Sequence, residues 1–184
     1  MRSLTTNKLL LVTLLICGPF FQAKVYAQNQ LPQFEATDLN GEGRLIPDDF
    51  FGRKILLGFA FSNQVQDALQ TWIEPIYYEM IDSTSLGSMV YDTEVLLVIC
   101  FNKANVNFKK KVESELKENV FEECFPNVVL TDSDGARIAE LLGVKDIRVP
   151  HLFAIDPSGK ISYHTSGKYS EGKFDKLSSF LEYE

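Results

Sequence analysis

The fold is decided by one stretch in the C-terminal half of the chain, Arg148-Val149-Pro150-His151-Leu152-Phe153-Ala154-Ile155-Asp156-Pro157-Ser158-Gly159-Lys160-Ile161. The run 152–155 contains no polar side chain, which is typical of a strand that is covered on both faces of its sheet. The next four residues suit a tight turn, because proline fixes φ and glycine accepts a positive φ. We therefore predict a central strand over 152–155 that returns as an antiparallel strand over 160–164.

The same stretch resembles the second half of a thioredoxin-like domain of the TlpA and peroxiredoxin type. The shared pattern is Val149-Pro150-x-x-Phe153-x-Ile155-Asp156-x-x-Gly159-Lys160-Ile161. The resemblance implies an α/β fold, a three-layer α/β/α sandwich with a central mixed sheet. It also implies a cis Val149–Pro150 bond in a loop that faces the redox-active cysteines of family members. It implies less about function, because folds of this kind carry many unrelated activities.

The N-terminal segment has the pattern of a signal peptide. Arg2 and Lys8 precede an apolar run over 9–16, and Val25-Tyr26-Ala27 is typical of a signal-peptidase site. The apolar run is shorter than the ~20 residues that span a bilayer. We therefore expect a signal peptide over 1–27, one thioredoxin-like domain over 28–184, and export to the periplasm or beyond without stable membrane insertion.

The charge of the chain limits its partners. The formal net charge is −7 and becomes −10 without residues 1–27, because that segment holds three basic residues and no acid. An acidic surface repels phosphate backbones and anionic headgroups, which argues against nucleic acid and membrane surfaces as partners. A protein or an extended peptide is the partner we expect.

The chemistry of thioredoxin-like enzymes is normally located where a helix follows the first buried strand, here predicted over 54–61. That helix is predicted to begin near Ser62 or Asn63, to continue to Met80 and to kink at Pro75. A thioredoxin needs Cys-x-x-Cys at its start, and a peroxiredoxin needs Thr-x-x-Cys. The chain has no cysteine between Cys17 and Cys100, so both sites are excluded in any alignment.

The remaining cysteines and histidines give no obvious reactive site. Cys100 is predicted at the end of one buried strand and Cys124 just before the next parallel strand, so the two thiols should lie too far apart for a disulfide. His151 is interpreted as a plain loop residue, because His164 is the only other histidine and no further ligand stands at metal-binding spacing. No metal and no cofactor are expected.

These observations favour a redox-inactive, exported thioredoxin-like domain that binds protein or peptide and is not an enzyme. The hypothesised groove pairs an extended peptide with the backbone of Val149. Its residues are Ser62, Asn63, Gln64, Asp67, Val149, Pro150 and His151. One alternative is a single-cysteine thiol oxidoreductase or peroxidase that uses Cys124 or Cys100. Another is an assembly factor resembling the YtfJ group, which rests on Trp72-Ile73-Glu74-Pro75.

Overall fold

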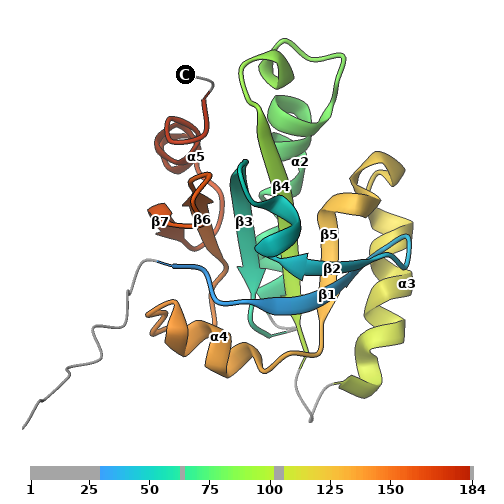
Figure 1. Ribbon diagram of the computed structural model, residues 1–184. Coiled ribbons are helices and arrows are strands. Elements are labelled where there is room, and N and C mark those ends of the chain that lie inside the picture. The colour runs from blue at the N-terminus through green and yellow to red at the C-terminus, as the bar shows by residue number, and fades with distance from the viewer. Residues whose placement is uncertain (1–29, 63–64, 102–105, 183–184) are drawn as a thin grey trace, which may run out of the picture.

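The computed structural model describes residues 30–62, 65–101 and 106–182. Its centre is a seven-stranded mixed sheet of order β2-β1-β5-β4-β3-β6-β7 (Figure 1). Strands β3, β4 and β5 are parallel, and β6 runs antiparallel to β3. The strands are β1 (Phe34–Asp38), β2 (Gly43–Ile46), β3 (Lys54–Ala60), β4 (Thr93–Cys100), β5 (Val128–Thr131), β6 (His151–Ile155) and β7 (Ile161–Ser166). The predicted signal peptide over 1–27 lies outside the described residues.

Helices cover both faces of this sheet, which confirms the predicted three-layer α/β/α sandwich (Figure 1). One face is covered by α1 (Gln66–Gln70), α2 (Ile73–Ile76), α3 (Lys109–Asn119) and α5 (Glu171–Ser178). The other face is covered by α4 (Gly135–Leu141) and by the 3-10 helix η1 (Asp48–Phe50). Short helical turns complete the chain: η3 (Tyr77–Ile81, a π-helix), η4 (Gly87–Met89), η5 (Val106–Phe108) and η6 (Glu122–Asn127).

The β6–β7 hairpin forms as the sequence predicts. All five residues of β6 are buried, and the strand lies inside the sheet between β3 and the edge strand β7. In the turn, Gly159 adopts a φ of 81° and its N–H donates to the carbonyl of Asp156 at 2.9 Å. The Asp156 side chain accepts from the backbone N–H groups of Ser158 and Lys160, which fixes the reversal.

The prediction of one kinked helix up to Met80 is wrong. Helix α1 begins at Gln66 and ends at Gln70, and α2 starts three residues later. Pro75 lacks the N–H that would bond to the carbonyl of Thr71, so the helical ladder is interrupted there. The indole N–H of Trp72 donates to the carbonyl of Gly167 at 3.0 Å, which fixes the break against the chain after β7.

The cis bond that the family resemblance implies at Val149–Pro150 is not present. In the part of the chain that the structure describes, the cis peptide bond is Ile46–Pro47, and Val149–Pro150 is trans. A trans bond lets the extended chain enter β6 directly. The Pro150 carbonyl accepts from the N–H of Gly167 at 2.8 Å, which continues the β6–β7 pairing by one step.

Candidate functional site

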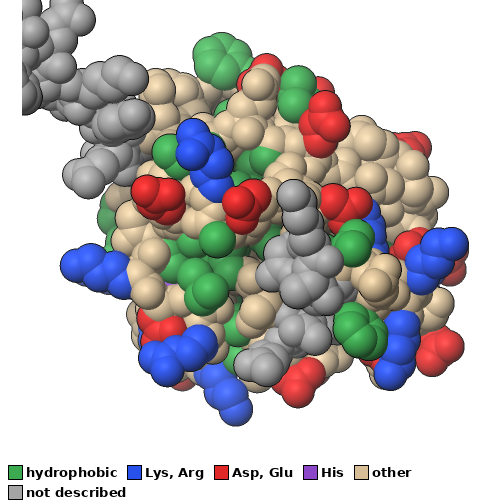
Figure 2. Space-filling view, turned by 90° about the horizontal axis from the view of Figure 1, so that it is seen from below, with side chains coloured by type: hydrophobic (Ala, Val, Ile, Leu, Met, Phe, Trp, Pro, Cys, Tyr) green, Lys and Arg blue, Asp and Glu red, His purple; other side chains and the backbone are tan. Residues whose placement is uncertain are grey.

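The predicted groove lies at the end of the sheet where β3 and β4 finish. The β3–β6 register pairs Phe59 with His151, so the chain that leaves β3 and the chain that enters β6 lie side by side. Phe61, just beyond β3, lies with its ring centroid 5.9 Å from that of His151. Figure 2 shows this end of the molecule from below, with hydrophobic side chains exposed among charged ones.

The predicted groove residues differ in their exposure. Ser62 and Val149 are half-buried and come from the two neighbouring segments. Asp67 is exposed in the first turn of α1, whereas Pro150 is buried. Asn63 and Gln64 lie outside the described residues. The structure therefore brings Ser62 and Val149 to the same end of the sheet as partly accessible side chains.

The interpretation of His151 as a plain loop residue is wrong. It is the first residue of β6 and only 4% exposed. Its Nδ1 lies 2.8 Å from Nε2 of His164 on β7, and its Nε2 lies 2.7 Å from the carbonyl oxygen of Asp146. Both ring nitrogens therefore have protein partners, and the buried side chain is not accessible as a groove residue.

The partners fix the tautomers of the two histidines. A carbonyl oxygen can only accept, so Nε2 of His151 carries a hydrogen and its Nδ1 accepts from Nε2 of His164. Both rings are neutral in this arrangement. Burial lowers the pKa of His151, and burial together with the neighbouring His151 lowers the pKa of His164 to about 4. The pair therefore stays uncharged at neutral pH.

The histidine pair extends a row of aromatic rings that begins in the core, with His151 buried and His164 exposed on the edge strand β7. The ring of His164 stacks on Phe153 with centroids 4.4 Å apart and planes 12° apart. Phe153 in turn meets Phe59 edge-on, and Phe59 stacks on Phe61. The His151 ring is buried, and one face of the exposed His164 ring is covered by Phe153, which disfavours the charged forms of both.

The two thiols are unpaired, as predicted, and both are buried. Cys100 ends β4, and Cys124 lies in η6 before β5, so the two stand at opposite ends of neighbouring parallel strands. Burial raises the pKa of Cys100 to about 12. Burial and the nearby Glu123 raise the pKa of Cys124 to about 11. Neither thiol has the exposed, low-pKa setting of a reactive cysteine.

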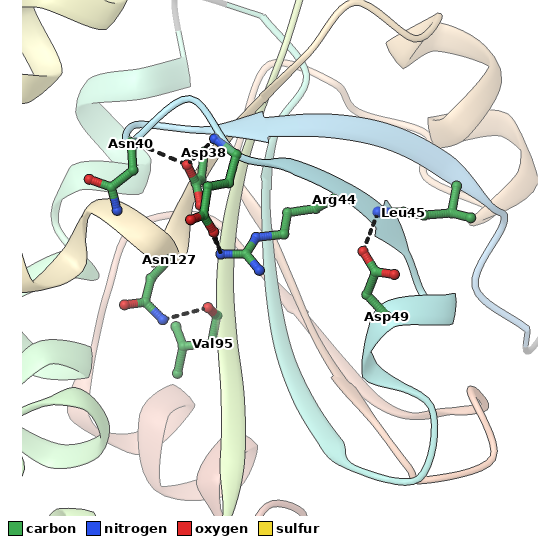
Figure 3. Close-up of polar contacts among 8 residues, drawn as sticks. Asp38, Asn40, Arg44, Leu45, Asp49, Val95 and Asn127 are labelled. Atoms are coloured by element: carbon green, nitrogen blue, oxygen red, sulfur yellow. Dashed lines mark hydrogen bonds and ion pairs between the residues drawn. The ribbon is translucent and has the colours of Figure 1, made fainter.

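A buried ion pair lies on the β1–β2 hairpin (Figure 3). The Asp38 carboxylate, fully buried, accepts from the N–H groups of Asn40 and Glu42 and from the guanidinium of Arg44, each at 2.9 Å. Arg44 also borders an open hollow of about 640 Å³ beside β1. The second cation of that hollow, Lys109, pairs with Asp132 at 2.8 Å. The cations there are thus engaged by the chain's own carboxylates, which favours a structural role.

Across residues 30–62, 65–101 and 106–182, no three potential ligands among His, Cys, Asp and Glu gather as a metal site would require. None of the helices in these ranges has the length and apolar character needed to cross a membrane.

Comparison with solved structures identifies the fold. The chain is similar to a pneumococcal exposed lipoprotein thioredoxin from Streptococcus pneumoniae, with a TM-score of 0.56 and 18% identity over 80% of this chain and 99% of that one. It is similar to the thioredoxin domain of a thiol-disulfide oxidoreductase from Bacteroides vulgatus, with a TM-score of 0.54 and 19% identity over 84% and 96%. It is also similar to a DsbE-type thiol:disulfide interchange protein from Chlorobium tepidum, with a TM-score of 0.53 and 17% identity over 83% of this chain and 96% of that one.

These likenesses show that the chain has the thioredoxin-like fold, as the sequence pattern predicts. No protein-family model and no curated protein matches the sequence. The structures that it resembles are thiol-disulfide proteins by their descriptions, whereas residues 18–99 of this chain contain no cysteine.

Sequence reasoning missed the histidine pair because it depends on a β-bulge. Next to the turn Ile155 pairs with Ile161, a register that would put His151 and His164 on opposite faces, and the register shift between Ala154 and Ile155 brings them to the same face. The observed register pairs Phe153 with His164, which makes His151 the diagonal neighbour of His164. The Asp38–Arg44 pair was missed because its burial depends on how the β1–β2 hairpin packs.

Proposed function

We propose that this chain is a redox-inactive, exported thioredoxin-like domain that binds an extended segment of a protein partner. The site is the surface between the chain that follows β3 and the chain that enters β6, and it includes Ser62 and Val149. One observation carries the proposal: a thioredoxin-like fold without any cysteine over residues 18–99, where the redox centre of such enzymes would stand. Without these cysteines the surface has no thiol for electron transfer, and we propose that it binds a partner instead.

The settings of the two thiols support this proposal over the single-cysteine alternative. Exchange and peroxide reduction both need an accessible thiolate. Cys100 and Cys124 are each 2% exposed, and burial raises the pKa of both. The alternative of a YtfJ-like assembly factor rests on the run 72–75. Trp72 is fully buried in the core, so packing already accounts for it.

Export is part of the proposal. Its basis is the N-terminal pattern of Arg2, Lys8 and the apolar run 9–16 before Val25-Tyr26-Ala27. The similar protein from Streptococcus pneumoniae is described as an exposed lipoprotein, which agrees with a location outside the cytoplasm. Fractionation of cells that express the full chain tests this part, and uncleaved protein in the cytoplasm would contradict it.

Peptide capture tests the binding function. Immobilised panels of unstructured 15-residue peptides would be probed with the wild type and with Ser62→Arg and Val149→Arg, which put a bulky charge on the two sides of the site. Ser162→Arg is the matched control, since Ser162 is exposed on β7. We expect peptides that bind the wild type and the control, with about tenfold weaker binding to both site variants (~1.4 kcal/mol). Equal binding by all four proteins would overturn the site.

A redox assay tests the absence of thiol chemistry separately. Reduction of insulin by dithiothreitol and consumption of hydrogen peroxide would be followed with the wild type and with Cys124→Ser. Both proteins should leave the uncatalysed rates unchanged. Acceleration by the wild type that is lost in Cys124→Ser would establish the single-cysteine alternative instead.

A further inference from the structure

A second hollow lies on the helical side of the sheet, between α2 and η3 on one side and α5 on the other. Its volume is about 470 Å³. Its lining combines four aromatic rings and a proline with four carboxylates: Tyr78, Tyr91, Tyr169, Phe174, Pro75, Glu74, Glu79, Glu171 and Asp175, with Ser178 beside them. We call this the tyrosine groove. None of its residues belongs to the proposed peptide site.

The rings of the tyrosine groove are held in place by the fold. Phe174 is buried, and Tyr169 packs its edge against Trp72 with centroids 5.4 Å apart. The backbone N–H of Tyr169 donates to the hydroxyl of Thr71 at 3.0 Å. Tyr91 forms a β-bridge with Glu182 near the C-terminus. Rings fixed in this way present their faces to a ligand with little loss of conformational freedom.

The four carboxylates of the tyrosine groove are exposed and form no ion pair within the residues that the structure describes. Elsewhere the chain pairs surface acids with its own lysines, as in Lys117 with Glu113. Lys173 of α5 donates instead to the carbonyls of Ser166 and Lys168. The groove therefore presents negative charge that no ion pair among residues 30–62, 65–101 and 106–182 neutralises.

Aromatic faces beside free carboxylates form a site for a cation. A guanidinium suits such a site best, because it stacks flat on aromatic rings and pairs with carboxylates through two parallel hydrogen bonds. An anion would meet four like charges. The chemistry of the groove thus selects a ligand that carries arginine.

Exposed apolar side chains beside the groove indicate that the arginine belongs to a protein segment. Leu86 is 84% exposed and Met89 is 79% exposed, which is unusual for large apolar residues. They flank and end η4, whose Gly87 packs so closely on Glu79 that an added Cβ would stand 2.6 Å from the Glu79 carbonyl oxygen. Leu86 and Met89 are therefore available for apolar contacts with a partner, next to Glu79 of the groove.

We propose that the tyrosine groove binds an extended segment of a partner protein in which arginine alternates with aliphatic residues. The arginine side chains lie between the tyrosine rings and pair with Glu74, Glu79, Glu171 and Asp175, and the aliphatic residues rest on Leu86 and Met89. This makes the domain a module with two independent binding surfaces.

The experiment uses a fluorescein-labelled nine-residue peptide in which arginine and leucine alternate. A second peptide replaces arginine with citrulline, which has nearly the same shape and no charge. The protein variants are the pair Glu74→Gln with Glu79→Gln in the groove and the control pair Glu118→Gln with Glu140→Gln, which are exposed elsewhere and change the net charge equally. Binding is measured by fluorescence anisotropy, and the fold of each variant is checked by its urea midpoint.

We expect the arginine peptide to bind the wild type and the control double variant with equal affinity. Its affinity for the groove double variant should be at least tenfold lower, and so should the affinity of the citrulline peptide for the wild type. An equal loss of affinity in the groove and control double variants would show that the peptide is attracted by the net charge of the protein, and it would overturn the proposed groove. Equal binding of the citrulline peptide would overturn the role of the guanidinium. Val149→Arg should leave this binding unchanged, so failure here is distinct from failure of the peptide site.

Discussion

Nδ1 of His151 and Nε2 of His164 lie 2.8 Å apart across the β6–β7 hairpin, and the proton of this bond belongs to His164. The pair can take up one proton and keep this bond, because a cationic His164 still donates from Nε2 to Nδ1 of His151. A second proton would place two N–H groups face to face. The hairpin therefore has a built-in sensitivity to acid.

Stability should fall as the pH drops from about 6.5 toward 4. The folded state lowers the pKa of both histidines, that of His164 to about 4, whereas an unfolded histidine titrates near 6.5. The unfolded state therefore binds more protons in this window, so stability that is present above pH 6.5 is lost on acidification. Hydrogen bonds from Arg148 lower the pKa of the Asp146 carboxyl to about 2, so this group adds a further loss of stability only below about pH 5.

Urea midpoints between pH 7.5 and 4.5 measure this effect. His164→Gln keeps an N–H donor at the position of Nε2 but cannot titrate, so its midpoint should fall less steeply between pH 6.5 and 4 than that of the wild type. Parallel profiles for the two proteins would show that the pair does not carry the dependence.

Both thiols should resist modification in the folded protein. Burial raises the pKa of Cys100 to about 12 and that of Cys124 to about 11, so almost no thiolate forms at pH 8. Ellman's reagent should react only as the protein unfolds, and in urea both thiols of the domain should react at once. Ser114→Cys, on the exposed side of α3, is the control that should react within the mixing time.

Removal of the buried carboxylate of Asp38 should destabilise the domain strongly. Asp38→Ala leaves the guanidinium of Arg44 without its nearest charge and two N–H groups without their acceptor. We expect a loss of about 3 kcal/mol, at the lower end for a broken buried pair because the Arg44 side chain is 27% exposed. Asp132→Ala breaks an exposed pair and should cost less than about 1 kcal/mol. Similar losses in the two variants would contradict a structural role for Asp38.

Two helical glycines should respond to alanine in opposite directions. At Gly135, which begins α4, a Cβ would stand 2.8 Å from Cβ of Cys100, so Gly135→Ala should cost about 1–3 kcal/mol. At Gly172 in α5 nothing lies within 4 Å, so Gly172→Ala should stabilise the domain by about 0.5–1 kcal/mol. The free energy of unfolding of both variants is measured by chemical denaturation. An unchanged stability of Gly135→Ala would contradict the close packing of α4 on the end of β4.

The strands were predictable because burial on both faces leaves a direct record in the sequence. The runs around Leu57 and Phe153 contain no polar residue, and the structure covers both faces of β3 and β6. The separation of Cys100 from Cys124 followed from the parallel order alone. Local composition decides features of this kind.

Other features depend on contacts between distant residues and left no local signal. The break after α1 is fixed by Trp72 and Gly167, which are far apart in the sequence. Phe108 has the helical spacing of the buried Val112 and Leu116 but is 54% exposed, because α3 begins only at Lys109. The tyrosine groove requires the packing of α5 against α2, which no single segment encodes.

The position of Trp72 also gives the domain an optical reporter. It is the single tryptophan of the chain, its ring is fully buried, and its indole N–H is bonded to the carbonyl of Gly167. Its fluorescence spectrum therefore monitors one junction, where the first helical segments meet the chain that follows the last hairpin. A red shift of its emission would reveal the opening of that junction without any label.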